Sequence, residues 1–434
     1  MLVFVAHPSQ RVKYILDELL LYRLGIDYTI TDSLAYFTKS RTKKIHYGNS
    51  IIEGCLNIPC APLLFEENIS EQKIECHKNE KWHTQMYALP YQNIPDFLVQ
   101  TTYLNFDLFA ASFYLLSRYE EYLPSARDEH NRFKPSNSFA FKNNFLEFPL
   151  LDHWHQLFAE TLIKQYPDIL IKRRVFQQIN TIDIDFAYKY WGHEFFPLFR
   201  KLLGSILKGK PDLKSVVPPK SDPYDTYDFL VQTANNKNIE TIFFLLLADY
   251  GGNDKNIPPL RDEMKLLVQK LMAKNKIGIH PSYKASLQSK TYFNEHQIFK
   301  TLTNYKPKLT RHHFLKAKLP DSYETMVEYE LLEDYTMGYA SALGFRASTS
   351  VPFKLFDLNK DVTLPILVFS PCVMDVTLKN NLGLNPKEAI EKISQIKKDV
   401  EKVNGTFISI WHNSSFDPSL GWVDWEQVYE SLFE

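Results

Sequence analysis

The feature that most constrains the fold is an alternation of short apolar runs and amphipathic helical patterns from about residue 175 onward. The run at 241–248, Thr-Ile-Phe-Phe-Leu-Leu-Leu-Ala, has no polar residue after its threonine. Such a run is typical of a parallel strand that is buried on both faces. The pattern at 261–273 then places four apolar residues on one helical face. This alternation predicts an α/β fold, with a parallel sheet or barrel.

The other expected elements of this region follow from the same hydrophobic periodicity. The C-terminal helix is the best specified, because Asn385 is a candidate N-cap, Pro386 occupies the first turn and Gly405 ends the pattern. The remaining expected helices are at 226–234, 295–302 and 323–332, and the expected strands are at 179–185, 241–248, 277–280, 308–311, 364–369 and 406–411.

The first part of the chain has a different pattern. A strand-like run at 2–6 is followed by a helical pattern at 14–24 and, much later, by a longer one at 107–122. Asp107 is the candidate N-cap of the later helix. Apolar residues nearly surround the axis of this helix, which predicts that it is buried.

Length and composition limit the classes of protein to which this chain can belong. At 434 residues it is long enough for two or three domains, and we expect an α/β accessory domain at 1–172 and a (β/α) domain at 173–434. The 50 basic and 51 acidic residues nearly cancel, so no charge argument favours nucleic acid or an anionic membrane as a partner.

The sequence contains no run of about 18 apolar residues, so it predicts no membrane span. The four cysteines lack a zinc-finger or CxxC spacing. We expect a soluble, cytoplasmic protein with free thiols; the oligomeric state is not indicated.

Polar side chains follow the apolar strands of the second part at the points where the strands end. In a parallel sheet or barrel these ends lie along one rim, where active sites are built. Carboxylates, imidazoles and a guanidinium are therefore expected to converge although they are far apart in the sequence. These side chains belong to Asp183, Asp185, Asp249, His280, Arg311 and His412.

Asp183 and Asp185 are two residues apart, so both point to the same face while the strand stays regular. Two carboxylates on one face repel each other unless a cation or an arginine lies between them. Carboxylate and imidazole ligands suit zinc or a similar divalent ion. The alternative is a strand edge with two solvated aspartates, which the matching positions of His280, Arg311 and His412 disfavour.

His280 lies in the segment Gly-Ile-His-Pro-Ser-Tyr, in which Pro281 ends the strand directly after the imidazole. This context favours a metal ligand over a structural histidine. Ser282 and Tyr283, the next two residues, are candidate hydrogen-bonding or stacking partners of a sugar. The high aromatic content of the chain, 14%, is consistent with sugar stacking as well as with an aromatic core.

Across residues 175–434 these segments resemble the signature motifs of the polysaccharide deacetylases, carbohydrate esterase family four. The matching segments occur in the family's order along the chain: Thr181–Asp185, Ile277–Tyr283, Arg311 and Trp411–His412. The resemblance implies an irregular (β/α) barrel with fewer than the eight strands of a complete one.

Within that family the chain is more similar to a bacterial subgroup that has an additional N-terminal domain. The resemblance rests on five short segments, which are Ser117–Tyr122, Arg311–Leu315, Asp334–Gly338, Gly344–Ala347 and Trp411–Asn413. It implies that residues before the barrel form the subgroup's own accessory domain.

The resemblance also implies roles for individual residues. Asp183 would be the general base, Asp185 the metal-binding carboxylate and His280 the first metal-binding imidazole. Arg311 would hold the base, and His412 would be the general acid. Because the family's adjacent Asp-Asp pair is Asp-Ile-Asp here, the base and the metal ligand could exchange roles.

The second metal-binding histidine of the family falls near Lys284, which cannot act as a ligand while protonated. His313 could supply the missing imidazole, because an alternating strand returns it to the same face as Arg311. On the same reasoning His312 faces away. If no substitute exists, the domain would be a degenerate one without catalysis.

The function implied by the resemblance is metal-dependent removal of acetyl groups from N-acetylated sugars of a cell-surface glycan or its precursor, with Zn²⁺ as the expected metal. The alternative is a glycan- or nucleotide-sugar-binding protein on a barrel that has lost catalysis. Asp334, Arg346 and Trp411 join Ser282 and Tyr283 as candidate substrate contacts. Asp375, beyond another strand end, could orient His412 or serve only as a structural cap or turn.

Overall fold

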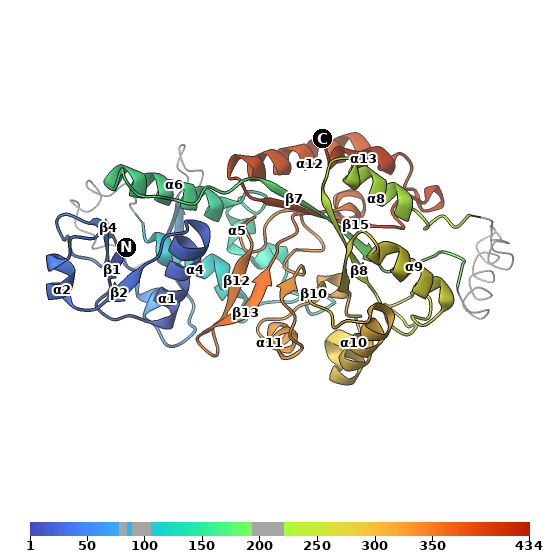
Figure 1. The fold of residues 1–434 in the computed structure, drawn as a ribbon, viewed down its shortest axis with the longest axis horizontal. Coiled ribbons are helices and arrows are strands. Elements are labelled where there is room, and N and C mark those ends of the chain that lie inside the picture. The colour runs from blue at the N-terminus through green and yellow to red at the C-terminus, as the bar shows by residue number, and fades with distance from the viewer. Residues whose placement is uncertain (78–84, 89–105, 193–220) are drawn as a thin grey trace.

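The computed structural model describes residues 1–77, 85–88, 106–192 and 221–434. Most strands belong to two sheets of an elongated molecule, with the smaller sheet at one end (Figure 1). None of the described helices is long and apolar enough to cross a bilayer.

The smaller sheet has four parallel strands in the order β2-β1-β3-β4. Its first strand along the chain, β1, is the expected N-terminal strand. The helical pattern expected at 14–24 is also confirmed, although it starts earlier because Ser9 accepts a hydrogen bond from the backbone of Val12 and caps the helix. The strands and helices are β1 (Leu2–Phe4), α1 (Gln10–Leu16) with a π-helical continuation (Asp17–Arg23), β2 (Thr29–Thr31), α2 (Leu34–Lys39), β3 (Lys44–Tyr47) and β4 (Leu56–Ile58).

Helix α4 (Leu108–Leu116) is buried on every side, as its apolar sequence predicts, and Asp107 caps it. It ends earlier than expected, because Arg118 adopts a left-handed backbone conformation with φ of 54° and a short 3₁₀ turn follows. The remaining elements of the first part are the hairpin of β5 (Ile74–His77) and β6 (Gln85–Ala88), and the helices α5 (Phe139–Lys142) and α6 (Leu150–Gln165).

The larger sheet has nine strands in the order β12-β13-β11-β10-β9-β8-β7-β15-β14, parallel except for the β12–β13 pair. Among the described residues a helix follows β7, β8, β9, β10, β14 and β15, whereas β11, β12, β13 and β14 succeed one another without a helix. The predicted alternation is therefore confirmed for most of the parallel strands. The strands are β7 (Gln177–Ile184), β8 (Glu240–Leu245), β9 (Lys276–Ile279), β10 (Leu309–Thr310), β11 (Glu333–Asp334), β12 (Phe353–Asp357), β13 (Val362–Val368), β14 (Val373–Met374) and β15 (Thr406–His412). The helices are α8 (Tyr227–Asn235), α9 (Asp262–Met272), α10 (Ser289–Thr303), α11 (Asp321–Glu328), α12 (Pro386–Lys402) and α13 (Trp425–Ser431).

The expected barrel is not closed. Among the described residues, no strand pairing joins β12 at one edge of the larger sheet to β14 at the other. The edge strand β14 has only two residues, which limits the hydrogen bonds that it could form with β12. The sheet is therefore a mixed, mostly parallel one, and its central strands β9, β8, β7 and β15 carry the expected polar ends.

A buried ion network joins the segment after α4 to the loop that precedes β12. Glu121 accepts hydrogen bonds from Arg118 at 2.8 Å and, through both of its oxygens, from Arg346 at 2.8 and 2.5 Å. All three side chains are at least 97% buried. Removal of the Glu121 charge would leave the buried Arg346 without a counter-charge and Arg118 with Glu120 alone, which is costly.

Glu121→Gln is expected to lower the free energy of unfolding by about 3–5 kcal/mol, because the buried guanidinium of Arg346 loses its counter-charge and Arg118 keeps only Glu120. Urea denaturation at pH 7 measures this change. The control Glu147→Gln breaks a partly exposed pair with Lys392 and should cost no more than about 1 kcal/mol. Equal losses in the two variants would contradict the expected role of the network.

The same network predicts a pH dependence. Burial alone would raise the pKa of Glu121, but Arg346 and Arg118 outweigh this effect and lower the pKa to about 2. A lowered carboxyl pKa contributes stability above the ordinary value of 4.5, and this contribution is lost as the pH falls toward 2. The decline in stability over this range should be shallower in Glu121→Gln than in the unaltered protein, and equal slopes would contradict the assignment.

Candidate active site

The register of the central strands sets the positions of the first two site residues. In the parallel pair of β7 and β15, Asp183 lies opposite His412. Asp185 follows the last residue of β7, two positions after Asp183, and its side chain reaches the same cavity. Pairing of β9 with β8 and of β10 with β9 brings His280 and Arg311 to the same edge.

Asp185, His280 and His313 form a group whose potential ligand atoms all lie within 4.8 Å of one another. His280 Nε2 lies 3.2 Å from Asp185 Oδ1, and His313 Nε2 lies 3.4 Å from Asp185 Oδ2. One carboxylate and two imidazoles match the donor set that zinc and similar divalent ions bind in catalytic sites.

The surroundings of the two imidazoles fit a metal ion. His280 Nδ1 lies 2.5 Å from the carbonyl oxygen of Arg311, and His313 Nδ1 lies 2.8 Å from Asp254 Oδ1. If each Nδ1 carries the proton, each Nε2 has a lone pair that faces Asp185, as in most histidine–metal sites. Asp185 Oδ1 is buried and accepts no well-aligned hydrogen bond from the described residues.

The charges around Asp185, His280 and His313 favour the protonated form of an imidazole and the ionised form of the carboxylate. Burial alone would lower the pKa of His313, but the carboxylates of Asp185 and Asp254 outweigh it and raise this pKa to about 9. Burial would raise the pKa of Asp185, yet His313, His280 and His412 hold it well below its ordinary value. The site therefore favours positive charge next to a carboxylate, and a divalent cation can supply that charge.

Asp183 is held by Arg311 and is not part of the candidate metal-binding group, Asp185, His280 and His313 (below, the metal-binding group). Arg311 Nη1 donates to Asp183 Oδ1 at 2.7 Å, and its Nε donates to the carbonyl of Tyr335 at 3.0 Å. The guanidinium also stacks on the ring of Phe244, with 4.5 Å between Cζ and the ring centroid. These contacts fix the orientation of the Asp183 carboxylate, whose other oxygen lies 3.8 Å from His280 Nε2.

His412 is oriented by Asp375. The Asp375 carboxylate accepts one hydrogen bond from the backbone N–H of His412 at 2.8 Å and lies 2.8 Å from its Nδ1. His412 Nε2 lies 3.5 Å from Asp185 Oδ2. Burial would lower the pKa of His412, but Asp375 and Asp185 raise it to about 10. His412 can therefore hold a proton at neutral pH and present it to the cavity.

These side chains surround one cavity of about 290 Å³. Besides the polar residues, an apolar group lines it, made of Leu315, Ala340, Met374 and Val376. His130 and Arg132, from the first part of the chain, also line the cavity. Arg132 is held there by Asp128 at 2.7 Å and by the carbonyl of Phe314 at 2.6 Å.

None of the five predicted substrate contacts is among the residues that line this cavity. Ser282 is buried, and its hydroxyl donates to Glu295 at 2.5 Å. Tyr283 lies nearer, because its hydroxyl is 3.4 Å from His130 Nδ1. Asp334 accepts from Tyr323 at 2.8 Å, Arg346 belongs to the ion network described above, and Trp411 packs against Trp425 and Tyr429.

Sequence reasoning missed Asp254, His130 and Arg132. The loop after β8 was expected to contribute Asp249, but Asp249 is exposed and Asp254, five residues later, reaches His313. A signal was available, since Asp254 follows the turn-forming residues Gly-Gly-Asn. Nothing in the sequence pattern indicated that the segment around His130 crosses to the larger sheet.

His313 reaches the site by a route other than the expected one. Strand β10 ends at Thr310, and His313 begins a short 3₁₀ turn in which its backbone N–H donates to the carbonyl of Pro281 at 3.0 Å. His312 points elsewhere, with its Nδ1 3.1 Å from the carbonyl of Lys316.

Comparisons with known proteins extend to both parts of the chain. Residues 1–167 match the model of a family of unknown function, DUF7033. The chain's sequence matches none of the curated proteins. Similar solved structures include a protein from Mycobacterium smegmatis provisionally named a polysaccharide deacetylase, which is 12% identical with a TM-score of 0.41 over 60% of this chain and 83% of that one.

Two other similar structures are GH57-type branching enzymes of hyperthermophilic archaea. The enzyme from Pyrococcus horikoshii is 8% identical, with a TM-score of 0.34 over 60% of this chain and 67% of its own. That from Thermococcus kodakaraensis is 9% identical, with a TM-score of 0.34 over 60% and 68%. Similarities of this size do not identify the reaction of the present chain.

The metal-binding group predicts the metal content of variants. The protein should bind about one divalent ion per chain, and His280→Ala, His313→Ala and Asp185→Ala should each lose most of it, because each removes one of only three protein ligands. Mass spectrometry of the metal in protein prepared without chelator measures the content. The control His130→Ala, which changes a histidine of the same cavity outside the group, should retain the ion. Retention by all four variants would contradict the assignment.

Asp254 should affect the metal without touching it. Asp254→Asn removes the charge that orients His313, and metal affinity is expected to fall roughly 10–100-fold. Competition with a chromophoric chelator gives the affinity. The control Asp249→Asn changes an exposed carboxylate of the same loop and should leave the affinity unchanged. If Asp254→Asn bound metal as tightly as the unaltered protein, His313 would not depend on this contact.

Proposed function

We propose that this protein is a metal-dependent hydrolase that removes acetyl groups from N-acetylated sugars. The observation that supports it best is that three sets of side chains, each suited to a different chemical role, meet at one cavity. One carboxylate and two imidazoles are suited to a cation, a second carboxylate is held by an arginine, and a third histidine is held by its own aspartate. Amide hydrolysis at a metal needs these functions together.

The cation belongs with Asp185, His280 and His313, and we infer Zn²⁺ from the donor set. When bound, it supplies Lewis acidity toward a carbonyl oxygen and toward water. The family's second histidine is missing near Lys284, and His313 is the substitute. The position of His313 favours a catalytic protein over the alternative of a sugar-binding protein without catalysis, because that alternative depends on the absence of a second imidazole.

The remaining residues handle protons. Asp183, oriented by Arg311, is positioned to accept a proton from water as that water attacks the acetyl carbonyl carbon. His412, oriented by Asp375, is positioned to donate its proton to the sugar nitrogen as the C–N bond breaks. The products are acetate and a free amine. Arg311 and Asp375 act as positioning residues in this scheme.

The apolar group of the cavity suits the acetyl methyl. Leu315, Met374 and Val376 line the cavity together with the polar residues, and Leu315 and Met374 are largely buried. An acetyl group could therefore direct its methyl toward these side chains and its carbonyl toward the metal-binding group. A bulkier acyl group would need more room on the apolar side.

We infer that residues 173–434 form the hydrolase domain and 1–172 an accessory domain with its own sheet. The accessory part contributes directly to the cavity through His130 and Arg132. Ser282, Asp334, Arg346 and Trp411 are at least 97% buried and do not line the cavity, so a substrate bound there would not touch them, whereas Tyr283 lies next to His130. A cell-surface glycan precursor as the substrate and a cytoplasmic location stay predictions.

Removal of either proton-handling group should stop the reaction. Asp183→Asn and His412→Ala are each expected to reduce acetate release by about 10²–10⁴-fold from N-acetylglucosamine oligomers or a nucleotide-linked N-acetylglucosamine, whichever the protein uses. Both should retain the metal, since neither residue belongs to the metal-binding group. Full activity in either metal-loaded variant would refute the assigned role.

Substitution of Asp375 tests whether this residue positions His412 for catalysis. In Asp375→Asn the imidazole of His412 loses its carboxylate partner, so kcat should fall while KM and metal content change little. The more conservative Asp375→Glu should recover part of the rate. If Asp375→Asn left kcat unchanged, Asp375 would have only a structural role.

A further inference from the structure

A second cavity, of about 460 Å³, lies away from the metal-binding group and is larger than the cavity described above. Its walls come from the end of the π-helical segment after α1, from α6, and from the extended segment 169–174 that leads to β7. Residues next to β12 and β15 complete it. None of the residues that line it lines the first cavity.

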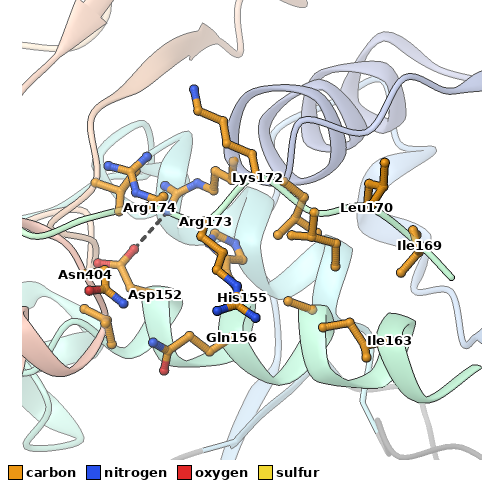
Figure 2. A pocket seen from close by; sticks show the side chains of 16 residues that line it. Asp152, His155, Gln156, Ile163, Ile169, Leu170, Lys172, Arg173, Arg174 and Asn404 are labelled. Carbon is orange, nitrogen blue, oxygen red and sulfur yellow. Dashed lines mark hydrogen bonds and ion pairs between the residues drawn. The ribbon is translucent and has the colours of Figure 1, made fainter. Parts of the chain in front are cut away.

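The charged side chains of this cavity gather at one end (Figure 2). Four of them are cationic, Arg23, Lys172, Arg173 and Arg174, whereas Asp152 is the only carboxylate in the lining. Burial and the nearby Arg23 both lower the pKa of Arg174, so the cations repel one another. This end of the cavity therefore has an excess of positive charge.

Asp152 offsets this positive charge only in part, because its carboxylate is already engaged by other groups. Its Oδ1 accepts from Arg23 at 2.9 Å and from Thr349 at 2.5 Å. Its Oδ2 accepts from the backbone and the hydroxyl of Ser350 at 2.7 and 2.6 Å. Among the described residues, no carboxylate forms an ion pair with Arg173 or Arg174.

Several buried polar atoms around this end lack partners within the described part of the chain. Both ring nitrogens of His155, which is 7% exposed, make no hydrogen bond, and neither does Nε of Arg23 or Arg174. Such groups cost free energy unless a ligand or water satisfies them. Arginine pairs with oxyanions through two parallel hydrogen bonds, so an oxyanion suits these donors.

The opposite end of the cavity is aliphatic. Figure 2 shows Ile163, Ile169 and Leu170 grouped there, away from Arg174 and Asp152. Leu170 is 91% exposed and Ile163 47%, so this end of the cavity presents apolar surface to water. A hydrocarbon chain placed along them would remove this apolar surface from water.

We propose that this cavity binds an amphiphilic oxyanion, with a phosphate or carboxylate head at Arg173, Arg174 and His155 and an aliphatic chain along Ile163, Ile169 and Leu170. The site lies between the first and the second part of the chain, because Arg23 and Asp152 come from one part and Asn404 from the other. A bound ligand would therefore connect the two parts and raise the unfolding temperature of the whole protein.

Calorimetric titration of the full-length protein with four probes tests the proposal. Octyl phosphate or octanoate should bind saturably, one per chain, and the tighter of the two identifies the head group. Inorganic phosphate should bind at least about tenfold more weakly, because it lacks the hydrocarbon chain whose burial stabilises the complex. Octyl glucoside, which has the chain without the charge, should give no saturable binding.

Two variants separate the two ends of the site. Arg174→Gln should weaken octyl phosphate binding about tenfold or more, since it removes a charge-assisted hydrogen bond. Leu170→Ser should weaken octyl phosphate while leaving inorganic phosphate unchanged. The control Arg41→Gln, at an exposed arginine outside the cavity, should bind as the unaltered protein does.

The unfolding temperature of the ligand-free variant shows whether a loss of binding comes from misfolding. Because burial and Arg23 disfavour the charge of Arg174 more than Asp152 favours it, Arg174→Gln should unfold at the same or a higher temperature without ligand, and octyl phosphate should raise that temperature less than in the unaltered protein. The proposal is overturned if neither octyl probe binds saturably, if Arg174→Gln binds as tightly as the control, or if inorganic phosphate binds as tightly as octyl phosphate.

Discussion

The parallel pairing of β7 with β15 and β8 is the constraint on which the rest of the site depends. Its register places Asp183 opposite His412 and leaves Asp185 just beyond the last residue of β7. A slip of one residue would turn one of these side chains into the apolar layer, where Ile182 and Ile184 now lie. Because the alternating residues on the other face are buried, packing fixes the register, and the register fixes the distances between the acidic and imidazole groups.

Side chains from outside the strands of the larger sheet orient the histidines and form part of the cavity wall. Asp254, from the loop after β8, and Asp375, beside β14, each orient one histidine. The first part of the chain contributes His130 and Arg132 to the wall. The buried network around Glu121 ties this part to the loop before β12. The site is thus built on a rigid sheet, but its walls depend on both parts of the chain.

Much of this arrangement could be predicted. Long apolar strands such as 241–248 and the capped helix after Asn385 are specified locally, and the structure has them within a few residues of the expected bounds. Two-residue strands such as β11 and β14 leave too short a pattern to be recognised, and β12 follows no helix. The irregular barrel that the resemblance implied is not confirmed, since the described strands form no closed circuit and closure depends on pairing between distant strand edges.

By itself the sequence determined the chemistry of the central strand ends, because hydrophobic period and chain order already place Asp183, Asp185, His280 and His412 at the same edge of a parallel sheet. Only the tertiary structure decided which groups orient them, and it turned His313 inward through a 3₁₀ turn rather than a strand. It alone revealed the second cavity, since Arg23, His155 and Asn404 are brought together by packing between elements that no local pattern relates.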